Sequence, residues 1–554
     1  MQYFRRLVFL ALVFLCGCAN VQIPTSDVTA TPPRPTIADI SNPTVPATLA
    51  PSDTPIPAPT IVLPEGGSIT IGVIGNLNLE FNVMPSLVQD AVFESLFKID
   101  PANGALKPGL AESFQVSNDA TTMTFKLRPG IKWHNGEALT ADDVVASIRA
   151  FSSSEFRGRP VTDFGTLTRS TAIDSQTVQL TFSDGYCGAL TSIGTMKIVP
   201  RAVAASPNFP KLTPTQMNGT GPLKFVSRTN DQIVFARNVD YYDGAPHIDS
   251  WTIRVFPDSA AMRGAFSNKQ IDLMPGTLDD YAALKKIPDA NTLRVASDSP
   301  EFLSILLNLD TTTLNDPRVR QALAYALDRN ALLNDIDGQA TLVDSSVLPN
   351  NWTYPANLPR FTYDVAQAKR LLADAGWRDA GDGVLKKNGK PMQLELWTEA
   401  DDPVLEPLAF HIRTMYAALG LQVSLQLDDR PGWVTRAFEH RFDLLLLSRK
   451  IPLDPDQRWY WQSDQNKPND GFNFGSYANT KLDGLFKDLQ HAPACDSAAR
   501  AATSGEIART LVVDSPVVFL FAPNKYLVAQ DRVFGLAPSP FAGDYWNLNN
   551  WRVK

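Results

Sequence analysis

Residues 19–64 cannot build a core, which confines the folded part of the chain to the residues after them. The segment holds 11 prolines, 8 threonines and 3 serines, and no aromatic residue. A stretch of this composition buries too little apolar surface to offset the entropy lost on ordering. We therefore predict a disordered, partly polyproline tether over residues 18–65 and a folded body that begins at residue 66.

The first residues have the pattern of an export signal. Arg5 and Arg6 precede the apolar run 7–15, which is too short to span a membrane. The sequence Leu15-Cys16-Gly17-Cys18 comes next and resembles the bacterial lipobox. We predict a lipoprotein signal peptide over 1–17 and a lipid anchor on Cys18, which would hold the protein at a membrane surface. An ordinary cleaved signal is the alternative.

The body of the chain reads as a globular α/β protein. Apolar residues make up 44% of the sequence and charged residues 19%, which excludes disordered and fibrous classes. Strand-like alternation begins at Ser68–Val73, and helix starts with capping residues occur at Thr140, Asp316 and Asp364. The net charge of −8 and the absence of a basic tract argue against nucleic acid as a partner.

Catalytic and metal chemistry are not indicated. No nucleophile-elbow pattern occurs, and no cofactor-binding motif is complete. The five histidines lie far apart and never at the spacing that places two ligands on one helix face: His134, His247, His411, His440 and His491. The acidic pairs 142/143, 401/402 and 454/456 are interpreted as helix caps or turns. We expect no enzyme activity, no metal and no cofactor.

Two thiols remain after removal of the signal and lipidation of Cys18, namely Cys187 and Cys495. An exported protein can oxidise such a pair to a disulfide. Their long separation in the sequence gives no support for pairing. We therefore predict two buried free thiols, with a disulfide as the alternative.

Several motifs in the body resemble, in order, those of bacterial ABC-importer solute-binding proteins of the peptide/nickel-binding family (family 5). The most specific block contains Ala111-Glu112-Ser113-Phe114, Trp133-His134-Asn135-Gly136 and Ala141-Asp142-Asp143-Val144. Further matches occur at Gly219-Thr220-Gly221-Pro222, Asn238–Tyr242 with Gly244-Ala245-Pro246, Asp316–Leu323 with Asp328-Arg329, and Tyr363–Gly376.

The resemblance implies a two-lobed α/β fold of the periplasmic-binding-protein type (type II) with an extra subdomain. It places lobe I at 66–98, 200–305 and 520–554, the subdomain at 99–199, and lobe II at 306–519. It also implies a monomeric, non-enzymatic receptor outside the cytoplasm. Such a receptor closes its lobes on a solute and delivers the solute to an ABC permease in the membrane.

The identity of the solute stays open. Oligopeptide binders of this family use an acidic residue for the peptide ammonium, before an acid-Pro pair that corresponds here to Asp454-Pro455. That alignment puts Ile451 at the acid and adds Arg449 and Lys450 beside it. Oligopeptide remains our first expectation, with an acid supplied elsewhere, for example by Asp401, Asp402 or Glu399. An oligosaccharide, an anionic metabolite, a metal chelate, or sensing without transport are the alternatives.

Candidate binding residues come from the resemblance and from side-chain chemistry. Aromatic rings can stack on a solute, and Arg449 has the planar fork that suits a carboxylate or phosphate. The alternative for Arg449 is a solvated surface arginine. Asn473 and Tyr477 match the family's Asn-x-x-x-Tyr segment. The complete candidate set is Trp397, Arg449, Trp459, Asn473, Tyr477 and Trp546.

Overall fold

The computed structural model describes residues 64–554 except 82, 154–155, 157–163, 277–279, 281–289, 297–300 and 337–339. For 290–296 it describes the backbone alone. The predicted signal peptide 1–17, the lipidation site Cys18 and the tether up to residue 63 lie outside this range. No helix within the described ranges is long and apolar enough to cross a membrane.

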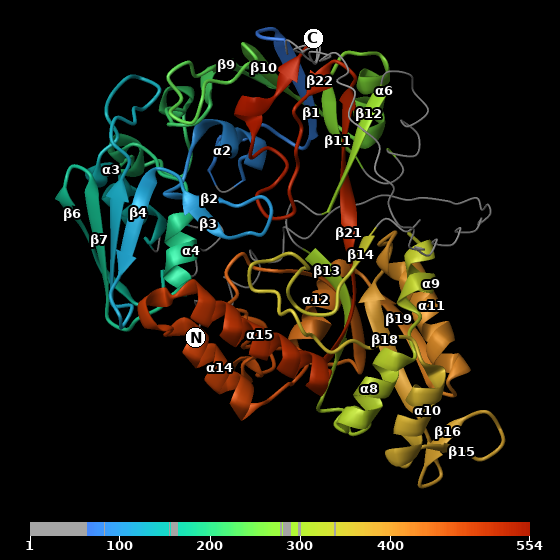
Figure 1. The fold of residues 1–554 in the computed structure, drawn as a ribbon. Helices are drawn as coiled ribbons and strands as arrows, with labels where there is room; N and C mark the ends of the chain where they lie inside the picture. Colours follow the sequence, from blue (N-terminus) through green and yellow to red (C-terminus); the bar gives the residue numbers. More distant parts are fainter. Residues whose placement is uncertain are drawn as a thin grey trace, which may run out of the picture.

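The two-lobed α/β fold is confirmed, and one long strand belongs to both lobes (Figure 1). The first half of β21 (Val517–Gln530) pairs with β13 (Glu301–Leu307) in the lower lobe. Its second half pairs with β11 (Leu273–Gly276) and β12 (Ala290–Ala296) in the upper lobe. The two lobes therefore share one continuous twelve-stranded sheet.

Lobe I, the upper part of Figure 1, contains the second half of β21 between β11 and β12. From β21 the sheet runs through β11 to β1, β10, β9 and β8. The alternation predicted at Ser68–Val73 is confirmed as β1, which is parallel to β10. The remaining elements are β1 (Ser68–Ile74), β8 (Leu223–Arg228), β9 (Gln232–Arg237), β10 (Ser250–Phe256), β22 (Val533–Phe534), β23 (Arg552–Val553), α2 (Ser86–Val92), α5 (Arg201–Ala204) and α6 (Ser259–Ser267).

Lobe II, the lower part of Figure 1, continues the sheet from β13 through β20 and β18 to β19. Asp316 and Asp364 accept hydrogen bonds from the first turns of α8 and α10, which confirms both predicted helix starts. Its elements are β14 (Ala340–Leu342), β15 (Arg378–Asp379), β16 (Leu385–Lys387), β17 (Lys390–Pro391), β18 (Gln393–Glu399), β19 (Gln422–Asp428), β20 (Leu444–Lys450), α8 (Pro317–Tyr325), α9 (Arg329–Asn334), α10 (Val365–Asp374), α11 (Leu405–Ala418), α12 (Arg430–Phe438), α13 (Arg458–Trp461), α14 (Thr480–Gln490) and α15 (Ser497–Asp514).

A small subdomain at the left of Figure 1 has its own four-stranded antiparallel sheet, ordered β4-β5-β7-β6. The predicted cap at Thr140 is confirmed, since Thr140 and Asp143 form a capping box at the start of α3. The elements are β4 (Ala111–Val116), β5 (Thr122–Leu127), β6 (Leu167–Asp174), β7 (Thr177–Phe182), α3 (Ala141–Phe151) and α4 (Gly188–Gly194), with the hairpin β2 (Phe97–Ile99) and β3 (Leu106–Pro108) beside them. The predicted limits of the lobes and subdomain stay predictions.

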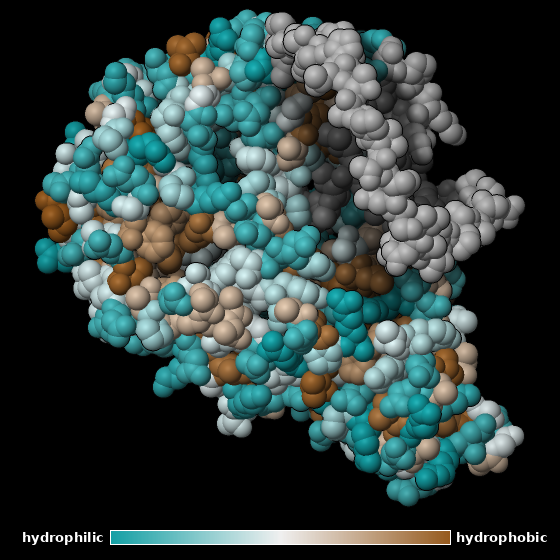
Figure 2. Space-filling view, in the orientation of Figure 1, coloured by the Kyte–Doolittle hydropathy of each residue, from teal (hydrophilic) through white to brown (hydrophobic). Residues whose placement is uncertain are grey.

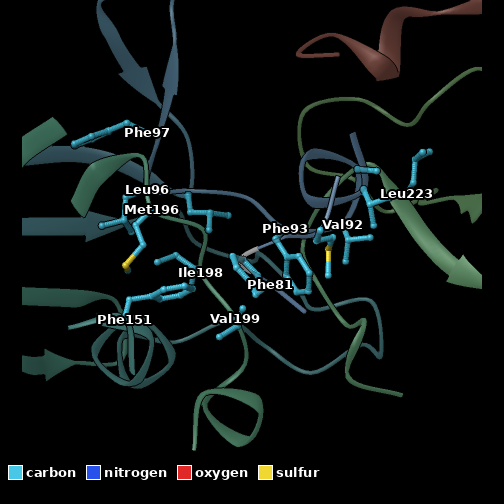
Figure 3. Close-up of a cluster of buried hydrophobic side chains, with 14 of the residues drawn as sticks. Phe81, Val92, Phe93, Leu96, Phe97, Phe151, Met196, Ile198, Val199 and Leu223 are labelled. Carbon is cyan, nitrogen blue, oxygen red and sulfur yellow. The ribbon is translucent and has the colours of Figure 1, made fainter. Parts of the chain in front are cut away.

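One hydrophobic core joins this subdomain to lobe I. The ring of Phe81, near the start of the body, lies 5.4 Å from the ring of Phe93 and 5.2 Å from the ring of Phe151 on α3. Ile198 and Val199 lie in the same cluster (Figure 3). Because these side chains are buried together, the subdomain and lobe I pack as one body. On the outer face drawn in Figure 2, hydrophilic side chains predominate and apolar ones form small groups.

The prediction of two free thiols is wrong. Cys187 and Cys495 form a disulfide, with Cα atoms 5.3 Å apart and a separation of 308 positions in the chain. Cys187 immediately precedes α4 of the subdomain, and Cys495 ends a short 3-10 turn just before α15 of lobe II. Tertiary packing brings these two segments together, which sequence separation could not reveal.

Two family motifs that lie far apart in the sequence meet at His134. Its Nε2 lies 3.0 Å from the carbonyl oxygen of Gly221, and its Nδ1 accepts a hydrogen bond from the amide of Gly219 at 3.3 Å. Burial lowers the pKa of His134 to about 4. The imidazole is therefore neutral at physiological pH and serves as a structural connector.

This pKa predicts acid sensitivity. An unfolded histidine takes up its proton near pH 6.5, whereas folded His134 does so near pH 4, so the unfolded state binds more protons between these values. Stability should fall as pH drops through this window, by at most about 3 kcal/mol from this residue. Urea unfolding of the wild type and of His134→Gln at several pH values measures how the free energy of unfolding changes with pH. The same change with pH in both proteins would contradict this role of His134.

Candidate functional site

The edge of the lobe II sheet that faces lobe I is made by strand ends. β18, β19 and β20 run parallel, so their carboxyl ends lie at one edge. β13 runs antiparallel to β20 and begins at the same edge, where Glu301 pairs with Lys450. Because β21 leaves lobe II for lobe I beyond Phe521, which pairs with Leu303 near the start of β13, this edge lies at the junction of the lobes.

Arg449 occupies this edge and is not the solvated arginine of the alternative interpretation. The residue is only 6% exposed. Its guanidinium lies 4.6 Å from the ring centre of Tyr460 and 5.0 Å from that of Trp461. Within the described part of the chain, the guanidinium of Arg449 has no carboxylate partner and no hydrogen bond. Burial lowers its pKa to about 10.

The neighbours of Arg449 are already paired. The ammonium of Lys450 lies 3.4 Å from Glu301, and the hydroxyl of Ser448 donates to the same carboxylate at 3.3 Å. Ile451, at the position that the motif alignment above assigns to an acid, is buried in the lobe II core. Among the described residues, this strand end thus holds one buried cation without a counter-ion and no carboxylate free for an ammonium.

The three candidate tryptophans come from separate parts of the structure. Trp397 lies on β18, where Arg436 stacks over its ring at 3.3 Å. Trp459 is 37% exposed and carries the guanidinium of Arg458 at 4.7 Å from its ring centre. Trp546, in the carboxyl-terminal segment, is 40% exposed and donates its indole N–H to a backbone carbonyl. No contact among the described residues joins these three rings.

Asn473 and Tyr477 are buried and bonded within lobe II. The amide of Asn473 donates to the carbonyl oxygens of Gln462 at 3.0 Å and Tyr477 at 2.8 Å. The hydroxyl of Tyr477 donates to Asp514 at 2.6 Å. These bonds fix the segment before α14 against α15, so they account for the Asn-x-x-x-Tyr pattern without a solute.

The acidic candidates have different environments. Glu399 pairs with Arg430 at 3.2 Å, while Asp402 accepts hydrogen bonds from the amides of Val404 and Leu405, as its predicted capping role requires. An open hollow of about 600 Å³ lies at the start of α11 and is lined by Asp401, Asp402, Pro403, Glu406, Pro407, Phe410 and His411. No group of histidine, cysteine and acidic side chains among the described residues could hold a metal ion.

Asp454 and Asp456 form the predicted turn, since Asp454 accepts from the amide of Asp456 at 3.0 Å. They also contact the subdomain, which the sequence did not reveal. Asp454 accepts from Thr191 at 2.7 Å and pairs with Arg500 at 2.6 Å. The acid-Pro pair that anchored the alignment therefore joins two parts of the structure.

Comparison with known proteins identifies the class. Residues 105–470 match the middle region of the bacterial extracellular solute-binding proteins, family 5. This chain belongs to that family, as its motifs predicted, and it is an extracytoplasmic solute-binding protein of an ABC importer.

Two curated relatives have different named ligands. The chain is 28% identical over 512 residues to the oligopeptide-binding protein AppA of Bacillus subtilis, covering 88% of this chain and 92% of AppA. It is 29% identical over 388 residues to the nickel-binding periplasmic protein of Escherichia coli, covering 66% of this chain and 72% of the relative.

Solved structures agree on the fold. The structure of B. subtilis AppA in complex with a nonapeptide has a TM-score of 0.65 and 25% identity, and covers 89% of this chain and 100% of that chain. The ABC transporter substrate-binding protein CtaP of Listeria monocytogenes has a TM-score of 0.75 at 24% identity, with 88% of this chain and 99% of that chain covered. The likeness to CtaP concerns the fold alone.

Proposed function

We propose that this protein captures an extracellular solute by closing its two lobes and then delivers the solute to an ABC permease. The main support for the proposal is that the chain passes between the two lobes twice. β21 passes from lobe II into lobe I, and β12 ends at Ala296 in lobe I shortly before β13 begins at Glu301 in lobe II. Two crossing segments of this kind form a hinge about which lobes close on a ligand.

Uptake measurements test the delivery step. Cells that lack this protein should lose import of radiolabelled oligopeptides, and expression of the intact chain should restore it. Unchanged import, together with a lost transcriptional response to the same peptides, would favour the alternative of a sensor without transport.

Oligopeptide is our first proposal for the solute class, supported by the name and nonapeptide complex of AppA. The environment of Arg449 restricts the kind of solute that fits. A guanidinium in a low-dielectric site without a counter-ion is costly, and a solute carboxylate would offset that cost. We propose that Arg449 binds an anionic group of the solute, such as the carboxyl terminus of a peptide.

A chelate of a metal ion is the second candidate, favoured by the match to a nickel-binding relative. The cargo would then be recognised through the carboxylates of its organic ligand, because the described residues offer no cluster that could coordinate the ion directly. Arg449 would bind a carboxylate of this chelate as it would bind the carboxyl terminus of a peptide.

Replacement of Arg449 separates a binding role from a structural one. Arg449→Met should weaken binding of peptides with a free carboxyl terminus by roughly 10- to 100-fold, the value of a hydrogen bond to a charged group. The same variant removes a buried unpaired charge, so its melting temperature should equal or exceed that of the wild type. Isothermal titration with a nonapeptide pool and with its carboxyl-terminally amidated counterpart measures the preference for a free carboxyl terminus. Undiminished preference for the free carboxylate in Arg449→Met would contradict the assignment.

We also propose that Cys18 carries the lipid anchor, on the strength of the lipobox and the long tether after it. Labelled palmitate should enter the wild-type protein but not Cys18→Ser. Fractionation should find Cys18→Ser outside the membrane pellet, because the lipid chains supply most of the membrane affinity. A Cys18→Ser protein that stays in the pellet would contradict this anchor.

A further inference from the structure

The small subdomain is bound covalently to the lobe opposite the one with which it shares a core. Cys187, at the start of α4, is disulfide-bonded to Cys495 of lobe II. Backbone bonds flank the disulfide on both sides. The amide of Cys187 donates to the backbone carbonyl oxygen of Gln490 at 2.8 Å. The amide of Ala494 donates to the backbone carbonyl oxygen of Asn118, in the subdomain, at 3.0 Å.

Buried polar contacts surround this disulfide. Thr191 of α4 donates to Asp454, which also pairs with Arg500, whose side chain is only 4% exposed. Tyr186 donates to Asp456 at 3.2 Å, and Arg458 both bonds to Asp456 and stacks over the Tyr186 ring. We call the contact of Tyr186, Cys187 and Thr191 with Asp454, Asp456 and Cys495 the latch.

The latch and the hinge lie on different sides of the molecule. In Figure 1, α4 meets the start of α15 at the lower left, whereas β21 crosses between the lobes near the centre. The subdomain cannot turn independently of lobe I, since both contribute to the core that contains Phe81, Phe93 and Phe151. Lobe I and its subdomain are thus connected to lobe II at two places.

A second connection restricts opening at the hinge. A rotation about β21 that opened the subdomain side of the molecule would move α4 away from α15. The Cα atoms of a disulfide stay within about 7 Å of each other, so the intact bond permits only those lobe rotations that keep α4 beside α15. The polar contacts alone could break and re-form with water, but the covalent bond cannot.

We propose that the disulfide holds α4 of the subdomain against lobe II while the lobes move, and that its reduction releases this contact. A dithiol reductant would attack one sulfur to form a mixed disulfide, and its second thiol would complete the exchange. Cys187 and Cys495 would become thiols, and the dithiol would become a disulfide, with two electrons and two protons transferred to the protein. The reduced protein would therefore gain a lobe motion that the oxidised protein lacks, a property beyond the proposed capture of solute.

Hydrogen exchange of the full-length chain tests the latch. In the oxidised wild type, the amides at positions 187 and 494 should exchange slowly. After complete reduction with dithiothreitol, checked by alkylation of both thiols, their exchange should rise by about tenfold or more. The double variant Cys187→Ser/Cys495→Ser should show the fast rate with or without dithiothreitol. Amides of β5 and β7 serve as controls for the integrity of the subdomain and should stay slow throughout.

Two results would overturn the proposal. In one, the oxidised wild type exchanges at these two amides as fast as the double variant, so the disulfide does not hold the latch. In the other, the reduced wild type stays slow, so the polar contacts suffice without the disulfide. Neither result depends on the identity of the solute, and loss of solute binding with an intact latch would count against the proposed function alone.

Discussion

Glu94→Ala should lower the free energy of unfolding by about 3 kcal/mol or more, because it removes the acceptor shared by two buried hydroxyl groups and one partly buried hydroxyl group. Glu94 is 6% exposed and lies between α2 and β2. Tyr241 donates to it at 2.8 Å, Tyr242 at 3.0 Å and Thr220 at 3.1 Å. The ammonium of Lys98 lies 3.6 Å away. Truncation leaves these donors without a partner, at a cost of about 1–3 kcal/mol each.

Glu94→Gln is the matched control, since its amide oxygen can accept hydrogen bonds that alanine cannot. Urea unfolding followed by tryptophan fluorescence measures the free energy of unfolding. This free energy should be highest for the wild type, lower for Glu94→Gln and lowest for Glu94→Ala. An alanine variant within about 0.5 kcal/mol of the wild type, the range of an ordinary surface change, would show that the network contributes little.

Asp454→Ala should destabilise the protein by about 3–5 kcal/mol, because it leaves a buried guanidinium without its counter-ion. Arg500 is almost fully buried and pairs with Asp454 at 2.6 Å, so removal of the carboxylate leaves a charge with little access to water. Thr191 loses its acceptor in the same change. The exposed pair of Glu506 and Arg509 offers a control. Glu506→Ala should change stability by less than about 1 kcal/mol. Equal effects of the two substitutions would contradict a buried role for Asp454.

Local signals predicted the elements and the family well. The alternation at Ser68–Val73 and the capping residues Thr140, Asp316 and Asp364 act within a few residues, so the sequence alone reveals them. The family motifs were recognised in order, and the structure explains why some occur together. His134 bonds to Gly219 and Gly221, while Glu94 accepts from Thr220 of the same motif and from Tyr241 and Tyr242.

Contacts between distant segments could not be predicted in the same way. The pairing of Cys187 with Cys495 depends on how the subdomain sits against lobe II, and no local pattern encodes that placement. The same holds for Asp454 and Thr191. Asn473 and Tyr477 matched a family pattern, yet a pattern match does not distinguish a ligand contact from the internal hydrogen bonds seen here. Only Arg449 among the six candidates combines burial with the lack of a polar partner in the described structure.

Native mass spectrometry of the full-length protein tests the capture of an anionic solute most directly. The protein would be titrated with a nonapeptide pool and, separately, with a nickel–histidine chelate, and Arg449→Met would be titrated beside it. We predict a mass increase of one solute per chain in the wild type with one of these two probes, and a much weaker increase in Arg449→Met. An unchanged mass of the wild-type protein with both probes would contradict the capture of an anionic solute.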